Sequence, residues 1–111
     1  MLRAALFFIL FSSALQPLKV AIPVDLLTNF RVDNNPFSDK LSFTFQLVRS
    51  STVRLEIYDE LGRQLFGDDL GYRNLGEFAY SLDVPSSWQH GIYYARLIAG
   101  GEVHTVKLVR Q

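Results

Sequence analysis

The chain contains no cysteine. Disulfides, thiolate metal sites and lipid attachment to an N-terminal cysteine are therefore excluded, and the folded part must be stabilised by packing alone. Histidine is also scarce: only His90 and His104 occur, and neither has a serine or carboxylate at a spacing that marks a catalytic set. We therefore expect no enzyme, and we interpret both histidines as ordinary surface or half-buried side chains.

Neither sign of charge is in excess, because eleven Lys and Arg residues are balanced by eleven Asp and Glu residues. This balance argues against a basic nucleic-acid-binding protein, and a hydrophobic content of 49% argues against a disordered chain. With 111 residues, the chain holds one domain at most. We expect a folded, near-neutral module with no cofactor, no nucleic-acid partner and no small-molecule substrate.

Residues 1–14 have the layout of a secretory signal peptide. Arg3 precedes a run from Ala4 to Phe11 that has no polar side chain, and Ser12 and Ala14 supply small side chains before a cleavage point after Ala14. The run is shorter than the roughly 20 residues that a membrane-spanning helix needs. The alternatives are an apolar N-terminal strand or the end of a preceding domain.

A linker is expected to follow the signal peptide. Pro17 and Pro23 disfavour a helix, so we assign residues 15–29 to an extended linker and residues 30–111 to the folded domain.

The rest of the chain is dominated by alternation with a period of two. In "LSFTFQL" (41–47) and "VRLEIY" (53–58), apolar side chains alternate with polar or aromatic ones, as in strands with one buried face. Further short runs of this kind are found at residues 63–66, 77–82, 92–99 and 103–109. This spacing predicts an all-β fold, an immunoglobulin-like antiparallel β-sandwich of about seven strands.

Glycines mark two of the predicted turns. Gly62 closes "DELG", where a left-handed residue lets the return strand begin, and Gly100 with Gly101 forms a two-residue hairpin turn. In "FGDDLGY", Asp68 and Asp69 are interpreted as a solvated loop because glycines flank them.

Two groups of side chains leave alternatives open. The oxygens of "DNNPFSD" (33–39) are of the kind that calcium prefers, but without the spacing of a calcium loop, so a turn before Pro36 is the favoured interpretation. Tyr58 should face outward, and the aromatic residues are more numerous than one small core needs. Exposed aromatic side chains favour protein contacts, with packing an equal alternative.

Four stretches in order suggest a family. "NPF" (35–37), "YDELGR" (58–63), "GIY" (91–93) and the final "GGEVHTVKLV" (100–109) resemble the C-terminal sorting domain, type A, of cargo proteins of the type IX secretion system. The likeness covers roughly residues 30–111, and "AIPVDLLTNFRV" (21–32) resembles the linker that often joins such a domain to its cargo. The residues that match the family's motifs are Asn35, Pro36, Phe37, Tyr58, Asp59, Gly62, Arg63, Gly91, Tyr93, Gly100, Gly101 and Lys107.

The resemblance implies an immunoglobulin-like, non-catalytic export signal. Its partners would be the outer-membrane translocon and a sortase-like peptidase of the type IX system, and the protein would pass through the periplasm to the cell surface or the medium. A large cargo normally precedes such a domain, whereas few residues precede it here. We therefore expect either a remnant or fragment of a longer gene, or a small domain that is itself the secreted product.

Two other functions suit the same fold. One is an immunoglobulin-like or fibronectin-like adhesion or scaffold module, and the other is a small carbohydrate-binding module in which Trp88 and the tyrosines would form a stacking platform.

Overall fold

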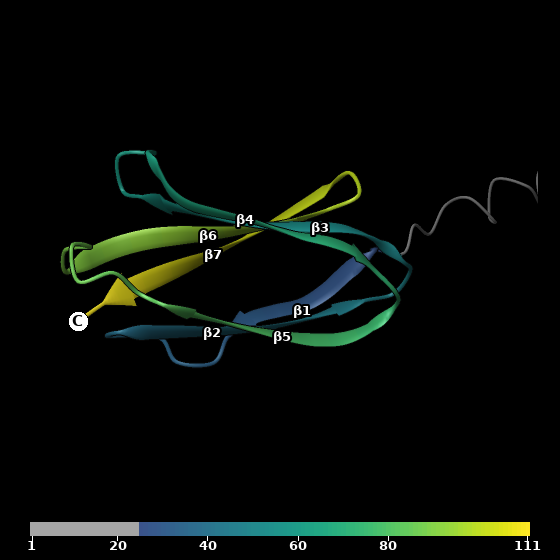
Figure 1. Cartoon of the computed structure of the whole chain (residues 1–111), viewed down its shortest axis with the longest axis horizontal. Helices are drawn as coiled ribbons and strands as arrows, with labels where there is room; N and C mark the ends of the chain where they lie inside the picture. Colours follow the sequence, from purple (N-terminus) through teal and green to yellow (C-terminus); the bar gives the residue numbers. More distant parts are fainter. Residues whose placement is uncertain (1–24) are drawn as a thin grey trace, which may run out of the picture.

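The computed structural model of the protein describes residues 25–111, so the expected signal peptide and most of the expected linker lie outside the described part. Its seven strands are β1 (Leu27–Val32), β2 (Lys40–Leu47), β3 (Ser51–Asp59), β4 (Gln64–Arg73), β5 (Gly76–Asp83), β6 (Gly91–Ala99) and β7 (Glu102–Arg110). They form two antiparallel sheets, β1-β2-β5 and β4-β3-β6-β7, that pack face to face (Figure 1). The predicted sandwich of about seven strands is confirmed.

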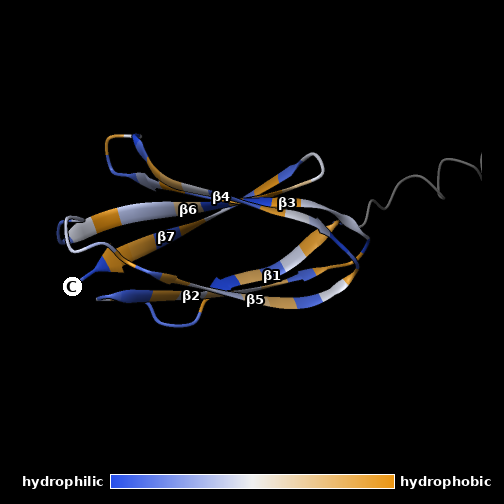
Figure 2. Ribbon diagram, viewed as in Figure 1, coloured by the Kyte–Doolittle hydropathy of each residue, from blue (hydrophilic) through white to orange (hydrophobic). Residues whose placement is uncertain are grey.

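Every second side chain of β2, β3 and β6 is buried between the sheets. Figure 2 shows the resulting change between hydrophobic and hydrophilic positions along the strands. The largest fully buried side chains are Phe37, Phe43, Leu27, Leu41, Leu47, Leu55, Ile57, Leu97, Leu108 and Val53. Burial of each such side chain contributes about 1.5–3 kcal/mol. Residues 25–111 thus contain two sheets and the core between them.

No helix among residues 25–111 is long and apolar enough to cross a membrane.

Strand β1 begins inside the segment that was expected to be linker. Leu26 and Leu27 are only 6% and 0% exposed, so the packed part of the chain starts before residue 30. The pairing of β1 with β2 shifts between Thr28 and Arg31, and Asn29 has a positive φ of 55°. This bulge breaks the alternation that identifies the other strands, which is why the sequence pattern did not predict β1.

Strand β4 extends much further than the predicted run at 63–66. Asp68 and Asp69 lie within it and pair with β3, so their interpretation as a solvated loop is wrong. The hydroxyl of Tyr80, on β5, donates a hydrogen bond of 2.6 Å to a carboxylate oxygen of Asp68. Two register shifts and a positive φ at Gly71 make β4 irregular, and its sequence therefore resembles that of a loop.

The turn between β6 and β7 has the expected two residues. Ala99 pairs with Glu102 across it, and Gly100 has a φ of +60°. A positive φ at the first turn position is the conformation that makes glycine the preferred residue in such hairpins.

Candidate functional site

Three segments that are distant in the sequence meet at the end of the sandwich where the chain finishes. They are the turn between β3 and β4, the loop of residues 84–90 before β6, and the last residues of β7 (Figure 1). Most of the residues that match the family motifs are found at or beside this end, which we call the C-terminal end of the sandwich.

Asp59 organises the turn between β3 and β4. One carboxylate oxygen accepts the backbone N–H groups of Leu61 at 3.0 Å and of Arg63 at 2.9 Å, and the other accepts the Arg63 Nε–H at 2.6 Å. These backbone bonds, together with the Arg63 guanidinium, lower the pKa of Asp59 from its ordinary 3.8. Gly62 has a φ of +85°, as the sequence predicted. The turn is therefore held by its own motif residues.

Tyr58 faces outward, as expected, and belongs to a polar network on the outer face of the sheet. Its hydroxyl donates to a carboxylate oxygen of Glu56 at 2.7 Å, and Arg54 Nε binds the other oxygen at 2.9 Å. The guanidinium of Arg96, on β6, lies 5.4 Å from the centre of the Tyr58 ring. The hydrogen bonds from Tyr58 and Arg54 lower the pKa of Glu56, so this carboxylate stays charged.

The segment Asn35–Phe37 is attached to the last strand. The side-chain amide of Asn35 donates to the Lys107 carbonyl at 2.9 Å, and its oxygen accepts the Val109 N–H at 3.0 Å. The Phe37 N–H donates to the Val109 carbonyl, and the Gln111 N–H donates to the Phe37 carbonyl, both at 2.9 Å. Phe37 is buried, and the peptide bond between Asn35 and Pro36 is cis. The motif thus acts as a short extra strand along part of β7.

Tyr93 anchors the loop before β6. Its ring is 5% exposed, packs edge-on against Phe37 at 6.1 Å between centroids and stacks on Trp88 at 5.3 Å. Its hydroxyl donates to the Gln89 carbonyl, and burial raises its pKa. Gly91, with a φ of +145°, starts β6. Trp88 and Tyr93 therefore do not form an exposed aromatic platform, because Tyr93 is buried and Trp88 is half-buried against it.

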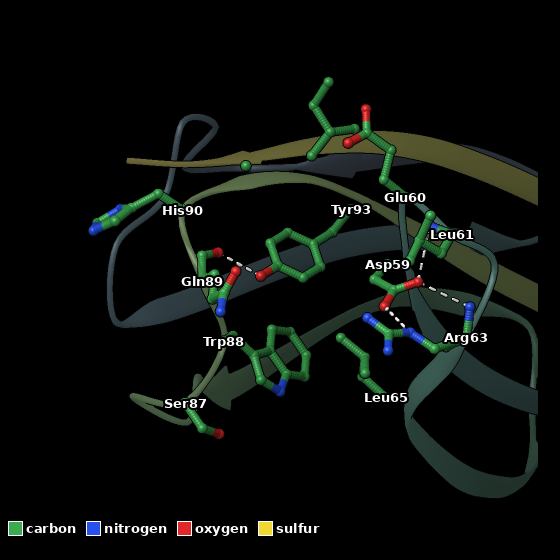
Figure 3. A pocket seen from close by; sticks show the side chains of 12 residues that line it. Asp59, Glu60, Leu61, Arg63, Leu65, Ser87, Trp88, Gln89, His90 and Tyr93 are labelled. Carbon is green, nitrogen blue, oxygen red and sulfur yellow. Dashed lines mark hydrogen bonds and ion pairs between the residues drawn. The ribbon is translucent and has the colours of Figure 1, made fainter.

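A pocket of about 440 Å³ opens at the C-terminal end of the sandwich. Asp59, Arg63 and Leu65 line one side of it, the 87–90 loop lines the other, and the rings of Trp88 and Tyr93 lie between them (Figure 3). Four of the twelve motif residues line it, namely Asp59, Arg63, Gly91 and Tyr93.

The remaining motif residues lie elsewhere. Gly100 and Gly101 form the turn at the opposite end of the sandwich, where a Cβ on Gly100 would lie 2.8 Å from Leu26 Cδ2. Lys107 lies along β7 with its side chain exposed on the outer face, paired with Tyr94 on β6. The structure therefore brings the first three motifs together but separates the glycine turn from them.

Two residues that sequence reasoning did not single out hold this architecture together. The carboxylate of Glu102 accepts the backbone N–H groups of Leu26 at 2.6 Å and Leu27 at 3.1 Å, which lowers its pKa. The Arg110 guanidinium donates to the carbonyls of Pro85 at 2.9 Å and Trp88 at 2.5 Å. No local pattern could have predicted these contacts, because their partners lie far away in the sequence.

The described residues provide little chemistry for catalysis or metal binding. His90 is exposed in the loop, and Nε2 of His104 lies 3.4 Å from the Glu102 carboxylate. Among residues 25–111 no three His, Cys, Asp or Glu side chains gather as a metal site. In the "DNNPFSD" segment, the Asn34 oxygen accepts the Ser42 N–H and its amide donates to the Lys40 carbonyl, as in a turn.

No curated protein matches this chain closely enough to count as a relative. A family model described as the secretion system C-terminal sorting domain matches residues 34–111, which is more than half of the chain. The matched segment contains all twelve motif residues and ends at the last residue of the sequence. Domains of this family serve the type IX, or Por, secretion system and are non-catalytic. The chain therefore belongs to the family of type IX secretion system C-terminal sorting domains, which direct export across the outer membrane.

Proposed function

We propose that the outer-membrane translocon of the type IX system recognises the folded sandwich through its final strand and the C-terminal end around it. The observation that supports this most is the attachment of Asn35 and Phe37 to Lys107, Val109 and Gln111. Motifs that lie near the start and at the end of the domain sequence thereby form one surface, which is present only in the folded domain. A protein that carries it would cross the periplasm folded and arrive at the cell surface or in the medium.

Secretion of a fluorescent reporter tests this proposal. The reporter has its own signal peptide, is fused ahead of residues 22–111, and is produced in a bacterium with a working type IX system and in a translocon-deficient sibling. We expect the reporter outside the first strain only. Reporter that stays in the periplasm of both strains would reject recognition by this translocon.

Deletion of residues 107–111 alone would not separate recognition from folding. The deleted residues bond Asn35 and Phe37, and Arg110 also holds the 84–90 loop, so the deletion would damage the fold itself. Lys107→Ala is a sharper variant because the Lys107 side chain is exposed on the outer face of β7. Lys40→Ala, on the other sheet, is its matched control. Recognition at β7 predicts weaker export for the first variant only, and equal export of both would place recognition elsewhere.

A sortase-like peptidase is the second partner that we propose. Leu26 and Leu27 are buried and bonded to Glu102, so the chain is protected from Leu26 onward, and cleavage is expected upstream of it. Mass spectrometry of the exported reporter checks this expectation. A reporter that keeps residues 26–111 after export would argue against removal of the domain.

Removal of residues 1–14 as a signal peptide is also a proposal. It rests on the apolar run after Arg3 and the small residues before the expected cleavage point. N-terminal sequencing of the natural protein from the periplasm should begin at Leu15, and a start at Met1 would contradict it.

A further inference from the structure

The outer edge of β7 takes part in hydrogen bonds near both of its ends and has unpaired backbone groups in between. The bonds from Asn35 show that the backbone groups of Lys107 and Val109 point away from β6. Because the β6–β7 ladder has no register shift, the N–H and C=O groups of Val103 and Thr105 must point the same way. Within residues 25–111 no backbone hydrogen bond reaches these groups.

The limits of this open edge are set by two side chains. At one end, the Asn35 amide donates a hydrogen bond to the Lys107 carbonyl. At the other end, the Glu102 carboxylate accepts the backbone N–H of Leu26, just before β1. The backbone from Val103 to the Lys107 N–H is left, and the Val103 side chain is 48% exposed. We call this stretch, Val103–Lys107, the open edge.

Bulges or charged side chains are found on the other three edge strands. Strand β1 has a bulge at Asn29, and β4 has two register shifts with Asp68 and Asp69 in its middle. Strand β5 has acidic side chains near both ends, Glu77 and Asp83. Proteins protect their sheet edges with bulges and charges of this kind. The open edge of β7 has neither a bulge nor a charge until Lys107.

We propose that the open edge binds an extended strand of the translocon by β-augmentation. This inference rests on the proposed function and names the kind of contact that the translocon makes. Five backbone groups are available, namely N–H and C=O of Val103 and Thr105 and the N–H of Lys107. Backbone groups of an added strand supply affinity in this mode, and alternate side chains supply specificity.

A second copy of the domain fits this edge less well. In a two-fold antiparallel pair centred on Thr105, Val103 of one copy would face Lys107 of the other. Asn35 already binds the carbonyl at that position and extends the covered edge to Gln111. Each copy would therefore hold its own covering segment against the other.

Proline at Thr105 tests the open edge. Proline removes the outward N–H and fills the edge with its ring, but it breaks no ladder bond to β6, because that N–H points away from β6. Thr105→Ala is the matched control, since it keeps the N–H. Val103→Pro, next to the turn, replaces Thr105→Pro if the latter fails to show a cooperative thermal unfolding transition.

The variants are compared in the reporter fusion with residues 22–111, which include the complete sandwich. We expect the folded proline variant to export about tenfold less reporter than Thr105→Ala, because bonds along the added strand are lost. Equal export by the two variants overturns the inference and leaves the proposed function intact. No export of the unmodified fusion would reject the proposed function and this inference with it. A purified domain that is dimeric in solution, and monomeric with Thr105→Pro, would assign the edge to a second copy instead.

Discussion

The side chain of Asn35 completes the edge of the last strand by bonding the backbone of Val109, 74 residues later in the sequence, at 3.0 Å. Its amide also donates to the neighbouring Lys107 carbonyl. An amide side chain presents a donor and an acceptor side by side, so it replaces one peptide group of a neighbouring strand. The segment before β2 thereby holds the end of the chain in place.

Replacement of Asn35 should weaken this attachment. Asn35→Ala removes two hydrogen bonds, and we expect the free energy of unfolding to fall by about 1–2 kcal/mol. Urea denaturation followed by Trp88 fluorescence measures the change. Trp88 is the only tryptophan, and its carbonyl accepts a hydrogen bond from Arg110, which lies on β7 next to Val109. Asn74→Ala, in the exposed connection between β4 and β5, is the control. Equal losses for the two variants would deny Asn35 this role.

The two glycines of the β6–β7 turn should respond differently to alanine. Gly100 has a φ of +60°, and its new Cβ would lie 2.8 Å from the buried Leu26 side chain. We expect Gly100→Ala to cost about 1–2 kcal/mol of unfolding free energy. Gly101 has no atom within 4 Å of a new Cβ, so Gly101→Ala should be nearly neutral. Thermal unfolding of both variants checks this difference. A similar fall in melting temperature for both would refute it.

The turn held by Asp59 should lose stability in acid. The folded-state pKa of Asp59 lies below its ordinary value of 3.8, so its contribution is present above that pH and is lost as the pH falls through the folded-state pKa. Asp59→Asn should lower the melting temperature at pH 7. It should also make the remaining stability less dependent on pH as the pH falls below the ordinary pKa of 3.8. Parallel pH profiles for the variant and the unmodified domain would rule out this contribution.

Tyr80 should ionise at a higher pH than an ordinary tyrosine. Its burial, and then its hydrogen bond to Asp68, raise its pKa to about 12. A raised pKa means that this stabilisation is complete below pH 10 and disappears as the pH rises toward 12. Titration by ultraviolet absorbance should show a late step that Tyr80→Phe removes. If Asp68→Asn leaves the late step unchanged, the hydrogen bond is not part of its cause.

Much of the fold could be predicted from short stretches of sequence. The alternation at 41–47 and 53–58 predicted β2 and β3, and Gly62 predicted a left-handed turn residue. Strand β4 could not be predicted in the same way, because its bulges, glycines and paired aspartates do not alternate. Its extended form is stabilised by pairing with β3, a contact outside any local pattern.

The candidate site was predicted only in part. The motif residues were identified by resemblance, and their order led to the family whose model matches residues 34–111. Their functions as recognition residues stay a prediction. The structure adds that Asp59, Asn35 and Tyr93 make internal contacts, so these positions serve folding whatever else they do.

Local chemistry was therefore sufficient for the regular strands, the glycine turns and the class of fold, because side-chain alternation and glycine conformations depend on near neighbours. Tertiary structure alone decided which distant groups meet. Glu102 accepts the N–H of Leu26, which lies 76 residues earlier, and Arg110 donates to the carbonyl of Pro85 in the loop before β6. Such partners are chosen by the order of strands in two packed sheets. That order arises from the burial of all the apolar faces together, so no single segment contains it.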